Sequence, residues 1–230
     1  MLETSHQRRE LDLGGHMLTI DLLLPSRPRG GVVLAHGRVD DLDHPSLKAA
    51  AQGAARQGWA ALRFNFPYRQ QGRKEPDSFA VLLQSHLAAC GWLAGQLPQG
   101  APLVPAGKSQ GSRTALAVLE HLPAAGVILL GYPLHGSRSR RPRPGEPLAL
   151  LRLPLLMVQG RRDPLARPEV LEPLLAGLPG PVRFWLVPGG SHSFAVPGGP
   201  RRQEEVWGKL GREVESFLAG LAPAGQKAVE

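Results

Sequence analysis

Apolar residues along the chain fall into two patterns, short continuous runs and longer stretches with helical spacing. A continuous apolar run predicts a strand that is covered on both faces, because such a strand has no side for polar residues. Runs of this kind lie at residues 18–25, 31–37, 59–66, 102–107, 126–133, 154–160 and 182–189.

The stretches with helical spacing lie between these runs. The stretch 77–97 places apolar residues on one face, with Asp77 or Ser78 as the N-cap. Helices are predicted from about Leu47 to Gly58, at 77–97, 114–122, about 145–152, about 165–177 and 203–221. Strands that alternate with helices predict an α/β fold, with a mostly parallel central sheet and helices on both faces.

The length of 230 residues suits one domain with a sizeable core. We predict a single domain at residues 18–221, preceded by an N-terminal segment at 1–17. The last residues, 222–230, read APAGQKAVE and are expected to be a disordered tail.

Ligands of open parallel sheets bind at the carboxyl ends of the strands. The residues that directly follow the predicted strands are therefore candidates for a functional site. They include Gly37, Arg38, Tyr68, Arg69, Ser109, His135, Asp163 and His192.

The segment AGKSQGSR, residues 106–113, matches two short motifs that have different chemical roles. Gly107 to Gly111 matches G-x-S-x-G, in which a nucleophilic serine lies on a sharp turn between a strand and a helix. The Gly-Lys-Ser within it also resembles the end of a phosphate-binding P-loop. The first glycine of a P-loop would then fall at Pro102, inside a predicted strand, so the nucleophile interpretation is favoured.

A serine nucleophile needs a base, and the base needs a carboxylate. Asp163 and His192 follow later strands in the order Ser, acid, His that this type of site requires. The simpler alternatives, a helix cap at Asp163 and a loop histidine at His192, stay open. The backbone N–H groups of Arg38 and Gln110 are the predicted oxyanion donors, and Gly37 lets that backbone approach closely.

The segments LAHG, FNFPYR, AGKSQGSR, GYPLHG, VQGRRDPL and PGGSHSF together resemble the α/β-hydrolase superfamily. The likeness is to a small branch with little or no cap, similar to dienelactone-hydrolase-like proteins and to testis-expressed and histone-acetyltransferase regulatory relatives. It covers about residues 18–221 and implies the same three residues as nucleophile, acid and base. It also implies that Tyr68, Arg69 and His135 lie near the mouth of the site, either binding substrate or packing.

A cap usually follows the strand at 126–133, but only about a dozen residues stand there before the next helix. An open cleft is therefore expected. The loop 137–143 holds Arg138, Arg140, Arg141 and Arg143. These arginines either bind an acidic group of the substrate or are simply solvated.

The net charge of +8 does not by itself indicate nucleic acid, because the aromatic platforms of nucleic-acid modules are missing. One cysteine, a polar start and no long apolar run predict a cytoplasmic protein that does not bind a membrane.

The expected activity is a serine hydrolase for small carboxylic esters or thioesters, with no cofactor and no metal ion. An acyltransferase and a non-catalytic module that binds a protein partner are the alternatives, and the oligomeric state is left open.

Overall fold

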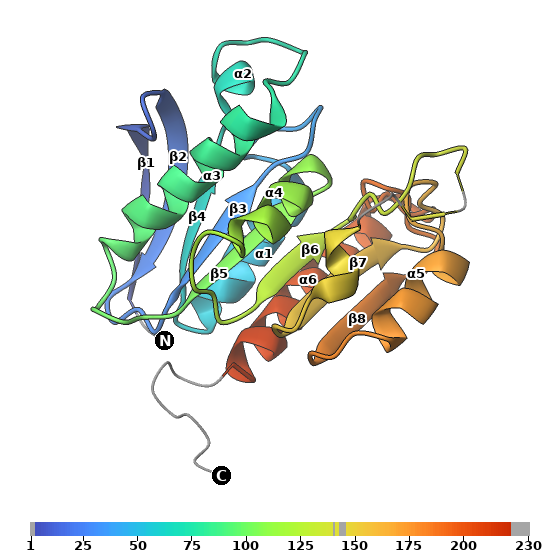
Figure 1. The fold of residues 1–230 in the computed structure, drawn as a ribbon. Helices are drawn as coiled ribbons and strands as arrows, with labels where there is room; N and C mark the ends of the chain where they lie inside the picture. Colours follow the sequence, from blue (N-terminus) through green and yellow to red (C-terminus); the bar gives the residue numbers. More distant parts are fainter. Residues whose placement is uncertain (1–2, 140, 143–145, 222–230) are drawn as a thin grey trace.

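The computed structural model describes residues 3–139, 141–142 and 146–221 (Figure 1). Its centre is one eight-stranded sheet in the order β1-β2-β4-β3-β5-β6-β7-β8. The strands are β1 (Thr4–Asp12), β2 (Met17–Pro25), β3 (Gly31–Ala35), β4 (Ala60–Phe64), β5 (Leu103–Lys108), β6 (Val127–Leu130), β7 (Leu155–Gly160) and β8 (Val182–Val187). Strand β2 runs antiparallel to β1 and β4, and the pairs from β4 to β8 are parallel.

Helices cover both faces of the sheet, as Figure 1 shows. One face packs against α3 (Phe79–Ala94), α4 (Gln110–Val118) and α5 (Pro168–Ala176). The other face packs against α1 (Pro45–Arg56) and α6 (Gly199–Ala219). The predicted mostly parallel α/β sandwich is thus confirmed.

The central strands are buried along their whole length, which explains their continuous apolar runs. Every residue of β3, β4, β6 and β7 is buried. In the edge strand β8 only Trp185 and Val187 are buried, because its outer side has no neighbouring strand.

Three elements differ from the sequence prediction. Strand β1 was not predicted, since its sequence TSHQRRELD is polar and mostly exposed, and it forms by pairing with β2 over nine residues. The short helix α2 (Pro67–Gln70) has only four residues and no periodicity to detect. Near 145–152 the structure has a single 3₁₀ turn, η1 (Pro147–Leu150), in place of a helix.

The segment that usually carries a cap is short. Within the described part of residues 131–146 no helix interrupts the connection from β6 to η1, so the open architecture is confirmed there. The predicted tail at 222–230 lies outside the described residues. Over the described ranges, no helix is both long enough and apolar enough to cross a membrane.

Candidate active site

Ser109 stands alone between the end of β5 and the start of α4. Its backbone has φ 52° and ψ −112°, a conformation that residues other than glycine seldom adopt. The strain is of the order of 1–3 kcal/mol and persists only where the surroundings enforce it. Part of that enforcement is a hydrogen bond of 2.9 Å from Ser109 N to the carbonyl of Leu130 in β6.

The two glycines of the motif make this turn possible. A Cβ on Gly107 would lie 2.3 Å from the carbonyl carbon of Gly111, and a Cβ on Gly111 would lie 2.2 Å from the carbonyl oxygen of Ala35. Helix α4 therefore starts in direct backbone contact with β3 and β5. Residues 103–108 form a strand, so no loop is present there to wrap a phosphate, which counts against the P-loop alternative.

Ser109, His192 and Asp163 form one continuous chain of hydrogen bonds. The distance from Ser109 Oγ to His192 Nε2 is 2.8 Å, and the distance from His192 Nδ1 to Asp163 Oδ2 is 2.6 Å. The three side chains come from the carboxyl ends of β5, β7 and β8. Asp163 is buried, while the His192 side chain is 24% exposed and so can be reached from the surface.

The Asp163 carboxylate is held by three donors. Besides His192 it accepts a hydrogen bond of 2.5 Å from Gln159 Nε2 on Oδ2 and one of 2.8 Å from Leu165 N on Oδ1. Because an ionised carboxylate only accepts, Nδ1 of His192 must carry a proton. Nε2 is then free to accept the hydrogen of the Ser109 hydroxyl.

The loop that carries His192 is fitted closely to the strand ends. Ser191 N donates to Ala195 O at 3.0 Å, and Ala195 N donates to Ser191 Oγ at 3.1 Å. A Cβ on Gly160 would lie 2.2 Å from Ser191 O. Ser191 therefore closes the loop that carries His192.

The turn after β3 lies against the nucleophile on its other side. A Cβ on Gly37 would come within 3.3 Å of Ser109 Cβ and 2.4 Å of Asp40 Oδ2, so the turn has room only for glycine there. Within the described residues, the backbone N–H groups of Arg38 and Gln110 donate to no protein acceptor. Two donors therefore remain unengaged on the two segments that flank Ser109.

Tyr68 and His36 fix this turn. The Tyr68 hydroxyl donates to Arg38 O at 2.8 Å. His36 Nε2 accepts from Phe66 N at 3.0 Å, so Nδ1 carries the proton and donates to Gly37 O at 2.7 Å. Burial lowers the pKa of His36 to about 4 and keeps the ring neutral.

The remaining predicted residues take mainly packing positions. His135 is buried, its Nε2 accepts from Arg167 N at 3.0 Å, and its Nδ1 bonds Gly136 O at 2.9 Å. Tyr68 is also fully buried, so neither ring leaves a polar atom for a ligand. Arg69 is 28% exposed and lies 3.7 Å from Asp41.

The arginine loop is only partly described. Arg138 and Arg141 are exposed, while Arg140 and Arg143 lie outside the described residues.

Sequence analysis missed several polar groups around the site. Gln159 sits in an apolar strand, and Ser112 Oγ donates to Ser109 O at 2.5 Å. Lys108, adjacent to the serine, is buried and paired with Asp40. A polar residue inside an otherwise apolar strand is a signal that could have indicated Gln159, whereas Lys108 follows the apolar run 102–107 and left no such signal.

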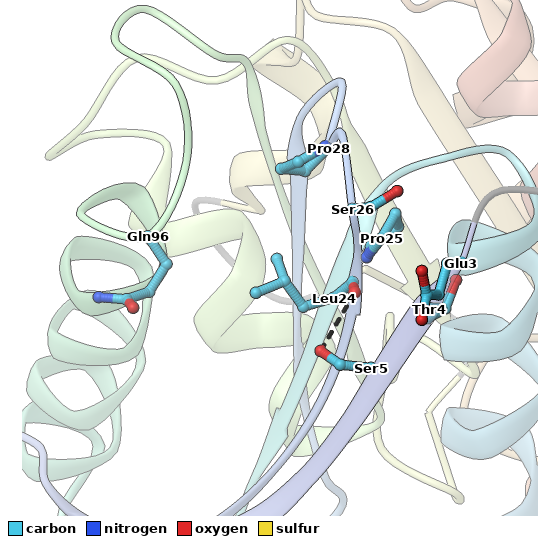
Figure 2. Close-up of a pocket in the computed structure, with 8 residues that line it drawn as sticks. All are labelled: Glu3, Thr4, Ser5, Leu24, Pro25, Ser26, Pro28 and Gln96. Carbon is cyan, nitrogen blue, oxygen red and sulfur yellow. Dashed lines mark hydrogen bonds between the residues drawn. The ribbon is translucent and has the colours of Figure 1, made fainter.

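A separate pocket of about 360 Å³ lies at the opposite end of the sheet (Figure 2). It is lined by Glu3, Thr4, Ser5, Leu24, Pro25, Ser26, Pro28 and Gln96. Leu24 and Pro25 end β2, which runs antiparallel to β4, and so lie near the amino ends of the parallel strands. None of its lining residues belongs to the hydrogen-bonded chain of Ser109.

A family profile described as an alpha/beta hydrolase domain matches residues 28–219. The chain belongs to this family. Two curated proteins from two strains of Mycobacterium tuberculosis are each 33% identical to it over 180 residues and carry the provisional name phosphoribosyl transferase. The match covers 77% of this chain and 39% of each relative, so the chain spans well under half of their length.

Solved structures share the fold across nearly the whole chain. A dienelactone hydrolase from Anabaena variabilis has a TM-score of 0.71 at 20% identity, covering 95% of this chain and 99% of its own. An α/β serine hydrolase without a lid from Xanthomonas campestris has a TM-score of 0.72 at 20% identity, covering 94% and 97%. At such identities the likeness shows the fold, and it agrees with the resemblance seen in the sequence.

Proposed function

We propose that this α/β hydrolase is a serine hydrolase that acts on carboxylic esters or thioesters. The observation that carries the proposal is the hydrogen-bonded chain from Asp163 through His192 to Ser109. The strained backbone of Ser109 supports it, because such strain concentrates at functional positions.

In the first half of the proposed reaction, Ser109 Oγ attacks the carbonyl carbon while His192 Nε2 takes the hydroxyl proton. The N–H groups of Arg38 and Gln110 stabilise the negative oxygen that forms. His192 then protonates the leaving alcohol or thiol, and an acyl group remains on Ser109. In the second half, His192 takes a proton from water while the resulting hydroxide attacks the acyl carbon. The bond from that carbon to Ser109 Oγ then breaks, the acid leaves, and His192 returns the proton to Ser109.

An acyltransferase would share the first half of this reaction and use an alcohol or amine in place of water. A non-catalytic module that binds a protein partner would need none of the three side chains. Phosphoribosyl transfer appears only in the name of relatives of which the chain spans 39%, and no group in the site argues for it. We therefore favour hydrolysis over these alternatives. We propose small molecules as the substrates and the cytoplasm as the location.

The test is covalent labelling with a fluorophosphonate probe, followed by mapping of the modified residue. The native chain should be labelled at Ser109, and Ser109→Ala and His192→Ala should both lose the label. Ser137→Ala is the matched control, because Ser137 is an exposed serine at the same edge of the sheet. It should be labelled like the native chain.

A panel of neutral and acidic esters and thioesters would then identify the substrate class. Replacing Arg138 and Arg141 by alanine should raise KM for acidic esters alone if the loop binds an acidic group. A folded native chain that takes no label would overturn the hydrolase proposal in favour of the binding module.

A further inference from the structure

Lys108 is a lysine buried inside the sheet, directly before the proposed nucleophile. Its exposed fraction is 1%, although lysine is almost never fully buried unless it is paired. Side chains alternate along a strand, so Lys108 shares a face with Val104 and Ala106, which pack toward α1 and α6. Nothing in the proposed reaction uses its ammonium group.

The partner of Lys108 is Asp40, in the turn after β3. Lys108 Nζ lies 2.8 Å from Asp40 Oδ2, and both side chains are largely buried, at 2% and 11% exposure. Burial alone would raise the pKa of Asp40, but Lys108, together with the nearby His44 and His36, outweighs this effect and the pKa lies below its usual value. The Asp40 carboxylate is therefore ionised, and its contact with Lys108 joins two segments 68 residues apart.

Asp40 closes the turn that contains the proposed oxyanion donor. Its backbone N–H donates to Gly37 O at 3.2 Å, so Gly37, Arg38, Val39 and Asp40 form one turn. Its Oδ2 lies against Gly37, at 2.4 Å from the place of a Cβ. Its other oxygen lies 3.8 Å from His44 Nε2, at the N-cap of α1.

The turn is thus held from two sides. Tyr68 and His36 bond its carbonyl oxygens, and Lys108 holds the carboxylate at its end. Gly37 O faces Tyr68 and His36, and in a trans peptide the Arg38 N–H points to the opposite side. The Lys108 contact links this turn to the residue that precedes Ser109.

We propose that the buried Lys108–Asp40 ion pair is a positioning device that holds the Gly37–Asp40 turn against the nucleophile turn and so sets the oxyanion hole. The inference rests on the proposed hydrolase function for its catalytic consequence. Neither residue touches the substrate. The geometry of the turn, however, can be measured without any activity.

The test uses Lys108→Met, Asp40→Asn and the double variant. Removing one partner of a buried ion pair leaves an unpaired charge, whereas removing both charges is often tolerated. Lys108→Met should therefore destabilise the fold, and the double variant should regain much of that stability. Asp40→Asn keeps an oxygen that can accept a hydrogen bond from Lys108. It is the single variant to be measured if Lys108→Met does not fold. Arg183→Met, which breaks the exposed pair of 2.7 Å with Glu213, is the control.

Two measurements separate positioning from plain stability. Hydrogen exchange of the segment 37–41 should become at least tenfold faster in Lys108→Met and in the double variant, while exchange of 159–165 stays unchanged. The kcat for the best ester should fall about a hundredfold in both, as after loss of an oxyanion donor, with KM little changed. The pH midpoint of kcat/KM should not move, because the contacts of His192 are intact.

Each result decides. A stable double variant with faster exchange of the turn and low kcat supports the device. If the native chain shows no hydrolase activity but exchange of the turn is faster in the variants than in the native chain, the device is kept and the hydrolase proposal is rejected. Unchanged exchange of the turn, or full kcat in the stable double variant, shows a structural ion pair only and overturns the inference.

Discussion

At the scale of single residues, the carboxylate of Asp163 determines how His192 is oriented and which tautomer it adopts. The amide of Gln159 donates to the same oxygen, Oδ2, that accepts from His192. In the described residues the other end of that amide, Oε1, has no partner. Gln159 therefore contributes one hydrogen bond to the site, and that bond goes to a charged group.

Replacing Gln159 by leucine should lower kcat/KM by about tenfold to a hundredfold in steady-state ester hydrolysis. A hydrogen bond to a charged group contributes about 1.5–3 kcal/mol, and each 1.4 kcal/mol corresponds to a factor of ten. The same change at Gln52, which is exposed on α1, should leave kcat/KM within about twofold. Equal kinetics for the two variants would exclude a role of Gln159 in holding the acid.

At the scale of elements, glycines distinguish a helix that is free on one side from a helix in backbone contact. Gly91 lies inside α3, and a Cβ there would meet no atom within 4 Å. Gly91→Ala should raise the free energy of unfolding by about 0.5–1 kcal/mol, because glycine is the poorer helix former. Urea unfolding measures the change, and a lower free energy of unfolding would contradict the open surroundings.

Gly111→Ala should do the opposite, although it also lies in a helix. Its Cβ would stand 2.2 Å from the carbonyl oxygen of Ala35 in β3, which is backbone and cannot rotate away. Helix α4 would have to shift, and overpacking of this kind costs about 1–3 kcal/mol. We expect a loss in that range by urea unfolding and loss of probe labelling at Ser109. A variant with native stability and labelling would show that α4 moves freely.

The elements that could be predicted from the sequence are those whose burial leaves an apolar pattern. Strands β3, β4, β6 and β7 are buried throughout and appear as continuous apolar runs. Strand β1 could not be found this way, because an exposed edge strand is held by backbone pairing with β2 and its side chains stay polar. Helix α2 is too short to show a period.

At the scale of the whole molecule, strand order explains why the proposed triad was predictable while its supports were not. Parallel strands bring their carboxyl ends to one edge, so residues that follow strands are candidates regardless of their distance in sequence. Ser109 and His192 are 83 residues apart and meet there. The contact of Lys108 with Asp40 instead depends on which side chain fills a buried space, and spacing along the chain carries no information about that.

The whole molecule also buries neutral histidines, which makes its stability depend on pH. His36, His44 and His86 lie in different parts of the fold, and burial lowers the pKa of each ring to about 4. In the unfolded chain a histidine has a pKa of about 6.5. Between these values unfolding takes up protons, so the free energy of unfolding must rise as the pH rises from 4 to 6.5.

Each histidine contributes a slope of up to about 1.4 kcal/mol per pH unit, so three together reach roughly 4 kcal/mol per unit near pH 5. The lowered pKa of Asp43, about 2, acts only below the usual pKa of a carboxyl and so outside this window. Urea unfolding from pH 4.5 to 9 measures the slope, which these rings leave flat above pH 7. His86→Gln, remote from Ser109 and in contact with Thr114, should remove about a third of it. A flat profile below pH 6.5 would mean that the rings are not buried as neutral groups.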